Sequence, residues 1–86
     1  MGVSKLGVEI TNRFFLAIDT LILKGEIRSL RQITIMYNIN YGNTHCMKTN
    51  PETYILKPEL IAKLTADFNI STEWMIHGYG EMFKKK

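Results

Sequence analysis

The chain has 86 residues, of which 45% are hydrophobic and 22% are charged, and its formal net charge at pH 7 is +3. A chain of this length has one hydrophobic core to bury, and this composition excludes an intrinsically disordered protein, so a single domain is expected over residues 1–83, with a basic tail at 84–86. The single cysteine, Cys46, excludes an internal disulfide and leaves too few thiols for the usual structural zinc site.

No targeting or membrane segment is recognisable. The first ten residues lack the apolar stretch of a signal peptide, and no apolar run approaches the roughly 18 residues of a membrane span. We therefore expect a protein of the cytoplasm, with Cys46 reduced and with no membrane partner.

Charge is distributed unevenly along the chain. Residues 1–50 carry six Lys and Arg against three Asp and Glu, whereas residues 51–86 carry five of each. Acidic residues are absent from Ile27 to Pro51, which is the pattern of a segment that lies against polyphosphate. Ordinary solubility charge explains a net charge of +3 equally well, and both interpretations stay open.

The first two helices are marked by periodicity and by capping residues. Apolar residues at i, i+4, i+7 and i+8 predict a helix from about Val8 to Lys24, ended by Gly25 in a left-handed conformation. Ser29 and Gln32 form a capping box in which the glutamine reaches back to the cap, so a second helix begins at Leu30. Its buried face is expected to hold Leu30, Ile33 and Tyr37, together with Ile35 or Met36.

A turn and a third helix follow. Asn38 tolerates the left-handed backbone of a turn, and Asn40 is expected to cap a helix from Tyr41 to about Thr49. Thr44 and Met47 should face inward, and Asn50, predicted to be left-handed, should end the helix before Pro51.

The rest of the chain predicts a covering loop and two further helices. The loop at 51–57 is apolar at Tyr54, Ile55 and Leu56, which we expect to lie over the core. A fourth helix begins at Pro58 and carries an apolar stripe up to Phe68. Ser71 caps a short fifth helix, with Ile70 placed to pack against Met75, and the later glycines end it.

Two blocks of these residues match a known pattern. The first is Ser29-x-Arg31-Gln32-Ile33, followed by Ile39-Asn40, Met47 and Asn50, and the second and more specific is FNISTEWMIHGYGEMF at 68–83. Together they resemble the lambda-repressor-like helix-turn-helix domains of the Cro, repressor and xenobiotic-response-element type, found in many phages and mobile elements. The resemblance covers about Glu9 to Phe83. It implies a compact all-α domain of five helices, of which the second and third form a DNA-binding helix-turn-helix.

The sequence departs from that family at several positions. Thr34 stands where most members have alanine, which adds a hydroxyl to satisfy, and Asn38 stands at the usual turn glycine. The loop that leads to Pro58 is longer than usual. The third helix also carries few strong base readers, since Lys48 is its only charged residue.

If the family's binding mode holds, the third helix enters the major groove of double-stranded DNA. The residues that the resemblance places at the base edges are Tyr41, Gly42, Asn43, His45 and Cys46. Those expected to contact phosphates are Arg28, Arg31, Asn40, Lys48 and Thr49. The function implied is a transcriptional regulator of the phage-repressor or Cro type.

Several further expectations concern partners and chemistry. No cofactor, metal site or enzyme activity is expected, because His45-Cys46 has only His77 to complete a ligand set and no nucleophile and base stand at plausible positions. Beyond the fifth helix, Tyr79, Met82 and Phe83 either return to the core or form a homodimer contact. The alternative function is a helix-turn-helix fold that serves as a protein-interaction module with weak or no DNA binding.

Overall fold

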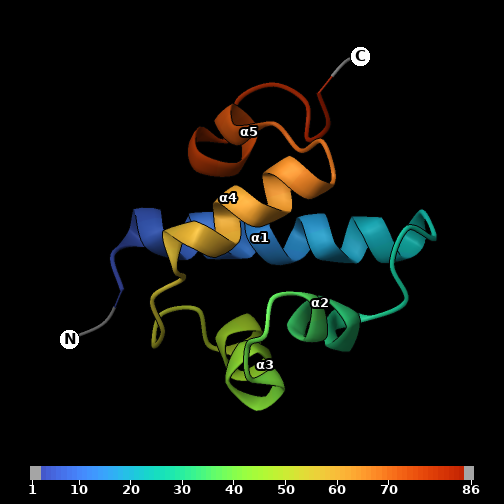
Figure 1. Ribbon diagram of the computed structural model, residues 1–86. Coiled ribbons are helices and arrows are strands. Elements are labelled where there is room, and N and C mark those ends of the chain that lie inside the picture. Colours follow the sequence, from blue (N-terminus) through green and yellow to red (C-terminus); the bar gives the residue numbers. More distant parts are fainter. Residues whose placement is uncertain (1–2, 85–86) are drawn as a thin grey trace.

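The computed structural model describes residues 3–84, and within this range it has five α-helices and no strand beyond a single antiparallel bridge between Ile70 and Phe83. The helices are α1 (Lys5–Leu23), α2 (Leu30–Met36), α3 (Tyr41–Thr49), α4 (Pro58–Asp67) and α5 (Thr72–His77). In Figure 1, α2 and α3 lie on one side of the long helix α1, and α5 lies on the other. The all-α prediction is confirmed, and none of these helices is long and apolar enough to cross a membrane.

Helix α1 is longer at its start than expected. It begins at Lys5, three residues before the predicted Val8, because the Ser4 hydroxyl oxygen accepts a hydrogen bond of 3.1 Å from the amide of Gly7. Its end is as predicted, since Gly25 has a φ of +78°. The amides of Gly25 and Glu26 donate back to the carbonyls of Ile22 and Leu21, both at 3.0 Å, which completes a Schellman motif.

The core forms around α1, and α3 adds only the partly buried Tyr41 and Met47 to its apolar contacts. Its largest fully buried apolar side chains, in chain order, are Phe14, Ile18, Leu21, Ile33, Leu64, Ile70 and Met75. Ile70 and Met75 are both fully buried, as the predicted staple at the start of α5 requires. Arg13 of α1 supports the other end of α5, where its Nε and Nη2 donate to the carbonyls of Met75 and Ile76 at 2.8 and 2.9 Å.

Helix α2 buries a narrower face than expected. Leu30, Ile33, Thr34 and Tyr37 are buried, at the i, i+3, i+4 and i+7 positions that complete one stripe. The prediction that Ile35 or Met36 would join them is wrong: Ile35 is 73% exposed and Met36 is 46% exposed. The Thr34 hydroxyl is satisfied, because it donates to the carbonyl of Arg31 at 2.7 Å.

The cap of α2 differs in one detail from the predicted capping box. The Ser29 hydroxyl accepts from the Gln32 amide at 3.4 Å, as expected. The Gln32 side chain, however, accepts from the amide of Arg28 at 2.7 Å, one residue before the cap. The first turn of α2 is thereby fastened to the preceding loop.

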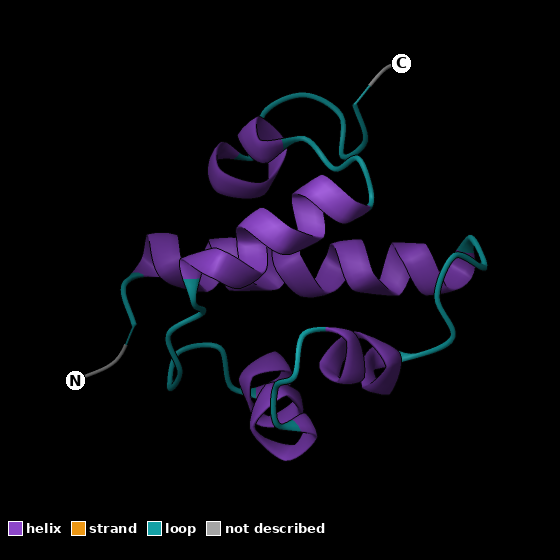
Figure 2. Cartoon of the chain, viewed as in Figure 1, coloured by secondary structure: helices purple, strands orange, loops and turns teal. Residues whose placement is uncertain are grey.

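The connection between α2 and α3 is a left-handed turn, which Figure 2 shows as a short loop. Asn38 has a φ of +53°, as predicted, and the Ile39 amide donates to the carbonyl of Thr34 at 2.9 Å. Asn40 then caps α3, its side-chain oxygen accepting from the Asn43 amide at 2.8 Å. Because the chain turns within four residues, α2 and α3 pack against each other.

The end of α3 corrects the prediction for Asn50. This residue has a φ of −132° and is not left-handed. The reason is Pro51, whose ring disfavours helical conformations in the residue before it and moves that residue toward extended backbone. Of the three apolar loop residues that follow, only Leu56 is buried, whereas Ile55 is 79% exposed, so the expected cover over the core is a single side chain.

The C-terminal segment returns to the core. The Ser71 amide donates to the carbonyl of Met82 at 2.8 Å, and Met82 and Phe83 are half-buried against the core. Tyr79 is 70% exposed. Of the predicted basic tail, Lys84 is exposed, and Lys85 and Lys86 lie outside the described residues.

Candidate nucleic-acid interface

Helix α3 turns one side to the core and the other to solvent. Thr44 is buried, with its hydroxyl donating to the carbonyl of Asn40 at 2.7 Å, and Met47 is half-buried. Tyr41 is also half-buried. The exposed residues of this helix are Gly42, Asn43, His45, Cys46, Lys48 and Thr49. Four of the five predicted base-reading residues therefore lie on one outward surface.

Tyr41 joins the two helices at this surface. The Arg31 guanidinium of α2 lies 4.2 Å from the centroid of the Tyr41 ring, and the His45 ring is stacked with the same ring at 6.0 Å between centroids. A cation over an aromatic face is attracted by the ring quadrupole. A predicted phosphate residue and two predicted base-reading residues are thus in direct contact.

Lys48 has a partner that its sequence context did not indicate. Its ammonium forms an ion pair of 2.9 Å with the carboxylate of Asp19 on α1, and both side chains are partly exposed. The only charged residue of α3 is therefore neutralised when the protein is alone. An exposed pair of this kind contributes little to stability, so a phosphate oxygen is able to replace the carboxylate.

Two of the remaining phosphate candidates have committed hydrogen bonds. The Asn40 side-chain oxygen is used by the cap of α3, and the Thr49 hydroxyl donates to the carbonyls of His45 and Cys46 at 3.3 and 3.2 Å. Arg28, before the cap of α2, and Arg31, in its first turn, are both exposed, and Arg31 reaches the first turn of α3 through Tyr41. The predicted phosphate cations are therefore divided, with Arg31 at the start of α3 and Lys48 in its last turn.

The absence of a side chain at Gly42 has a cause within the fold. A Cβ added there would come within 3.2 Å of the Asn40 side-chain oxygen that caps the helix. A larger residue would crowd that oxygen. The glycine therefore relieves a tight contact with the cap, and this contact does not involve DNA.

A groove of about 430 Å³ borders the outward surface of α3, and sequence reasoning did not indicate it. Its walls include Asn43 and Met47 from α3 and Tyr54, Ile55 and Lys57 from the loop before α4. Lys57 adds a further cation to the wall of this groove. Neither Lys57 nor Asp19 carried a sequence signal, because contacts between distant segments leave no local periodicity.

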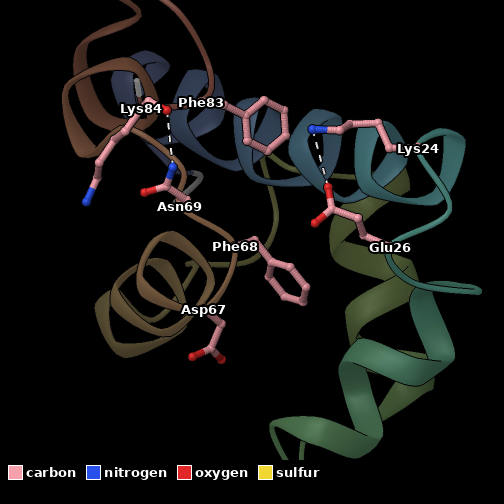
Figure 3. A pocket seen from close by; sticks show the side chains of 7 residues that line it. All are labelled: Lys24, Glu26, Asp67, Phe68, Asn69, Phe83 and Lys84. Atoms are coloured by element: carbon pink, nitrogen blue, oxygen red, sulfur yellow. Dashed lines mark hydrogen bonds and ion pairs between the residues drawn. The ribbon is translucent and has the colours of Figure 1, made fainter. Parts of the chain in front are cut away.

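A second hollow, of about 400 Å³, lies away from α3 between the ends of α1 and α4 and the C-terminal segment (Figure 3). Lys24 pairs with Glu26 at 3.3 Å and lies 3.9 Å from the centroid of the Phe83 ring. Asn69 donates to the carbonyl of Lys84 at 3.1 Å. These polar groups bond to one another and leave little to fix a ligand. Across residues 3–84, no three His, Cys, Asp or Glu residues gather as a metal site would require.

Comparison of the chain with protein-family models, with curated proteins and with solved structures finds no match in any of the three. A functional assignment therefore depends on the residues and geometry of the chain itself.

Proposed function

We propose that this chain is a DNA-binding transcriptional regulator of the phage-repressor or Cro type. In this proposal α2, the turn at Asn38 and α3 form a helix-turn-helix, and α3 enters the major groove of double-stranded DNA. The observation that carries the proposal is the outward surface of α3. It is polar, it contains no acidic residue, and Arg31 stands beside its first turn, over the ring of Tyr41.

Base recognition falls mainly to Asn43. Its side chain is exposed and is not used by the cap, which takes only its backbone amide. A side-chain amide of this kind pairs with N6 and N7 of adenine through two hydrogen bonds. His45 and Cys46, two and three residues further along the helix, are also exposed and complete the reading set.

Phosphate contacts fall to Arg28, Arg31 and Lys48, the last after release from Asp19. Each neutralised phosphate contributes about 0.9 to the slope of log affinity against log salt. Three such contacts give weak binding for one copy of the chain, so tight binding requires two copies on a two-fold site. A homodimer through the C-terminal region would centre on Tyr79, because Met82 and Phe83 are already packed against the core.

The alternative, a protein-interaction module with weak or no DNA binding, is favoured by one observation. Helix α3 has a single cation, and that cation is already paired with Asp19. A surface so nearly neutral attracts phosphate weakly.

Selection from a pool of random DNA duplexes, at low and moderate salt, separates the two functions. The regulator is expected to enrich a defined sequence, and Asn43→Asp, which places an acid on the outward surface of α3, is expected to abolish the enrichment. The matched control is Asn12→Asp, because Asn12 is exposed on α1. If no sequence is enriched and affinity stays weak even at low salt, the regulator function is wrong.

A further inference from the structure

The outer face of α2 combines cations with exposed apolar side chains. We use this name for the surface formed by Arg28, Arg31, Ile35 and Met36, which surround an open hollow of about 500 Å³. In Figure 1, α2 lies at the edge of the molecule, on the opposite side of α1 from α5. The four residues of this surface are all exposed, so the outer face of α2 is open to a partner.

The apolar part of this face is not explained by folding or by DNA. Ile33 and Thr34, next to it on the same helix, are buried, whereas Ile35 is largely exposed and Met36 is nearly half exposed. Single exposed apolar residues are common, but here two are adjacent and line one hollow. Phosphate oxygens gain nothing from contact with an isoleucine, so the proposed DNA contacts leave this feature unused.

Within the described residues, the charged part of the face has no carboxylate partner, and the Arg31 guanidinium rests over the ring of Tyr41. Neither arginine takes part in the two ion pairs found among residues 3–84, which are Lys24 with Glu26 and Lys48 with Asp19. The segment from Ile27 to Pro51 contains no acid of its own. An arginine guanidinium binds a carboxylate through two parallel hydrogen bonds, which gives such a pair both energy and geometry.

We propose that the outer face of α2 binds an acidic, amphipathic segment of a partner protein. Apolar side chains of the partner fill the hollow against Ile35 and Met36, and its carboxylates pair with Arg28 and Arg31. Arg31 is also a proposed phosphate contact, so the partner and DNA exclude each other. This competition rests on the proposed function, whereas binding of the acidic segment does not.

The probe is a display library of random helical peptides, selected against the full chain. Enriched peptides are expected to interleave Asp or Glu with apolar residues. A selected peptide, measured by fluorescence anisotropy, should bind Ile35→Ser and Arg31→Ala roughly tenfold more weakly than the unchanged chain. The matched control is Leu6→Ser, because Leu6 is 58% exposed in the first turn of α1, and its peptide affinity should be unchanged.

Each result decides one part of the proposal. The docking site would be overturned if the selected peptides lacked Asp and Glu. It would also be overturned if Ile35→Ser bound the selected peptide as tightly as the unchanged chain does. Self-association that Ile35→Ser abolishes would assign the face to a second copy of the chain and overturn it as well. When a duplex that the chain binds is measured as well, Ile35→Ser should weaken the binding of the peptide only. Arg31→Ala should weaken the binding of both the peptide and the duplex.

Competition is read in the same assay. If peptide and duplex bind together, the exclusion is wrong although the docking site stands. If the peptide binds as expected and no duplex binds at all, the DNA-binding function fails and the docking site again stands.

Discussion

Asn43 and Arg31 both lie near the first turn of α3, but they are expected to contribute differently to DNA binding. Replacement of Asn43 by alanine removes a base contact and should change which base is preferred at one position, at a cost of about 1–3 kcal/mol for the preferred base. Replacement of Arg31 by alanine should weaken binding to all sequences alike and lower the salt slope by about 1. Binding measured across a panel of single-base variants of the selected duplex checks both. If Asn43→Ala lowered the affinity for all duplexes of the panel equally, Asn43 would not be a base-reading residue.

Tyr41 contacts both Arg31 and His45 through its ring, which predicts that the ring matters more than the hydroxyl. Tyr41→Phe keeps both contacts and should bind DNA as the unchanged chain does. Tyr41→Leu releases the guanidinium and should weaken binding by about 0.5–1 kcal/mol, the size of an exposed cation–π interaction. Affinities for the selected duplex and for its single-base variants, measured side by side, check both expectations. A change of base preference in Tyr41→Phe would show that the hydroxyl reads a base.

At this scale the sequence indicated local features and missed distant ones. The caps at Ser29 and Asn40 and the left-handed Asn38 follow from residues within four positions of each other, so they could be predicted. The pair of Lys48 with Asp19 joins residues 29 positions apart and carries no such signal. The error at Asn50 arose because the effect of Pro51 on the preceding residue outweighs the tolerance of asparagine for a left-handed backbone.

Among the helices, α2 is tied to α4 by one polar contact. The Tyr37 hydroxyl donates to the Asp67 carboxylate at 2.8 Å. Burial, and then the hydrogen bond and negative charge of Asp67, raise the pKa of the Tyr37 phenol well above its ordinary value of 10.0. The phenol thus ionises at a lower pH in the unfolded chain than in the folded one. The contact therefore stabilises the folded state fully below pH 10, and this contribution is lost as the pH rises above 10.

Tyr37→Phe should therefore destabilise the domain by about 1 kcal/mol at pH 7, which is below the usual range for a bond to a charged group because Asp67 is exposed. Above pH 10, the difference in unfolding free energy between the two proteins should narrow. Urea unfolding at neutral and alkaline pH measures both quantities. A difference that stays constant with pH would mean that the tyrosine bond does not couple folding to ionisation.

The order of the helices could be predicted, since the apolar periodicity of α1 and α4 and the capping residues of the other three mark each one. Which side of α2 faces outward could not be predicted as reliably. A helix of seven residues offers about two turns, and its hydrophobic residues at 33, 35 and 36 allow more than one buried stripe. In the structure Thr34 is buried and Ile35 is exposed, because Thr34 lies on the same helical stripe as Leu30 and Tyr37.

For the molecule as a whole, the fold leaves exposed side chains along the segment from Ile27 to Pro51, which contains no Asp or Glu. The other elements supply the scaffold, because α1 carries α3 on one side and α5 on the other, and α5 in turn packs against α4. The C-terminal segment folds back toward α4 through the bond between the Lys84 amide and the Asn69 carbonyl, at 2.9 Å. Residues 28–31 and 41–49 thus form the surface for which the account predicts a duplex.

The most direct test is amide NMR of isotope-labelled protein titrated with the selected duplex at low salt. If α3 is the DNA-binding element, chemical-shift changes should concentrate in residues 41–49 and at 28–31, and they should saturate as one binding event. Changes confined to the C-terminal segment at 79–84, or no changes at all, would contradict the claim that α3 is the DNA-binding element.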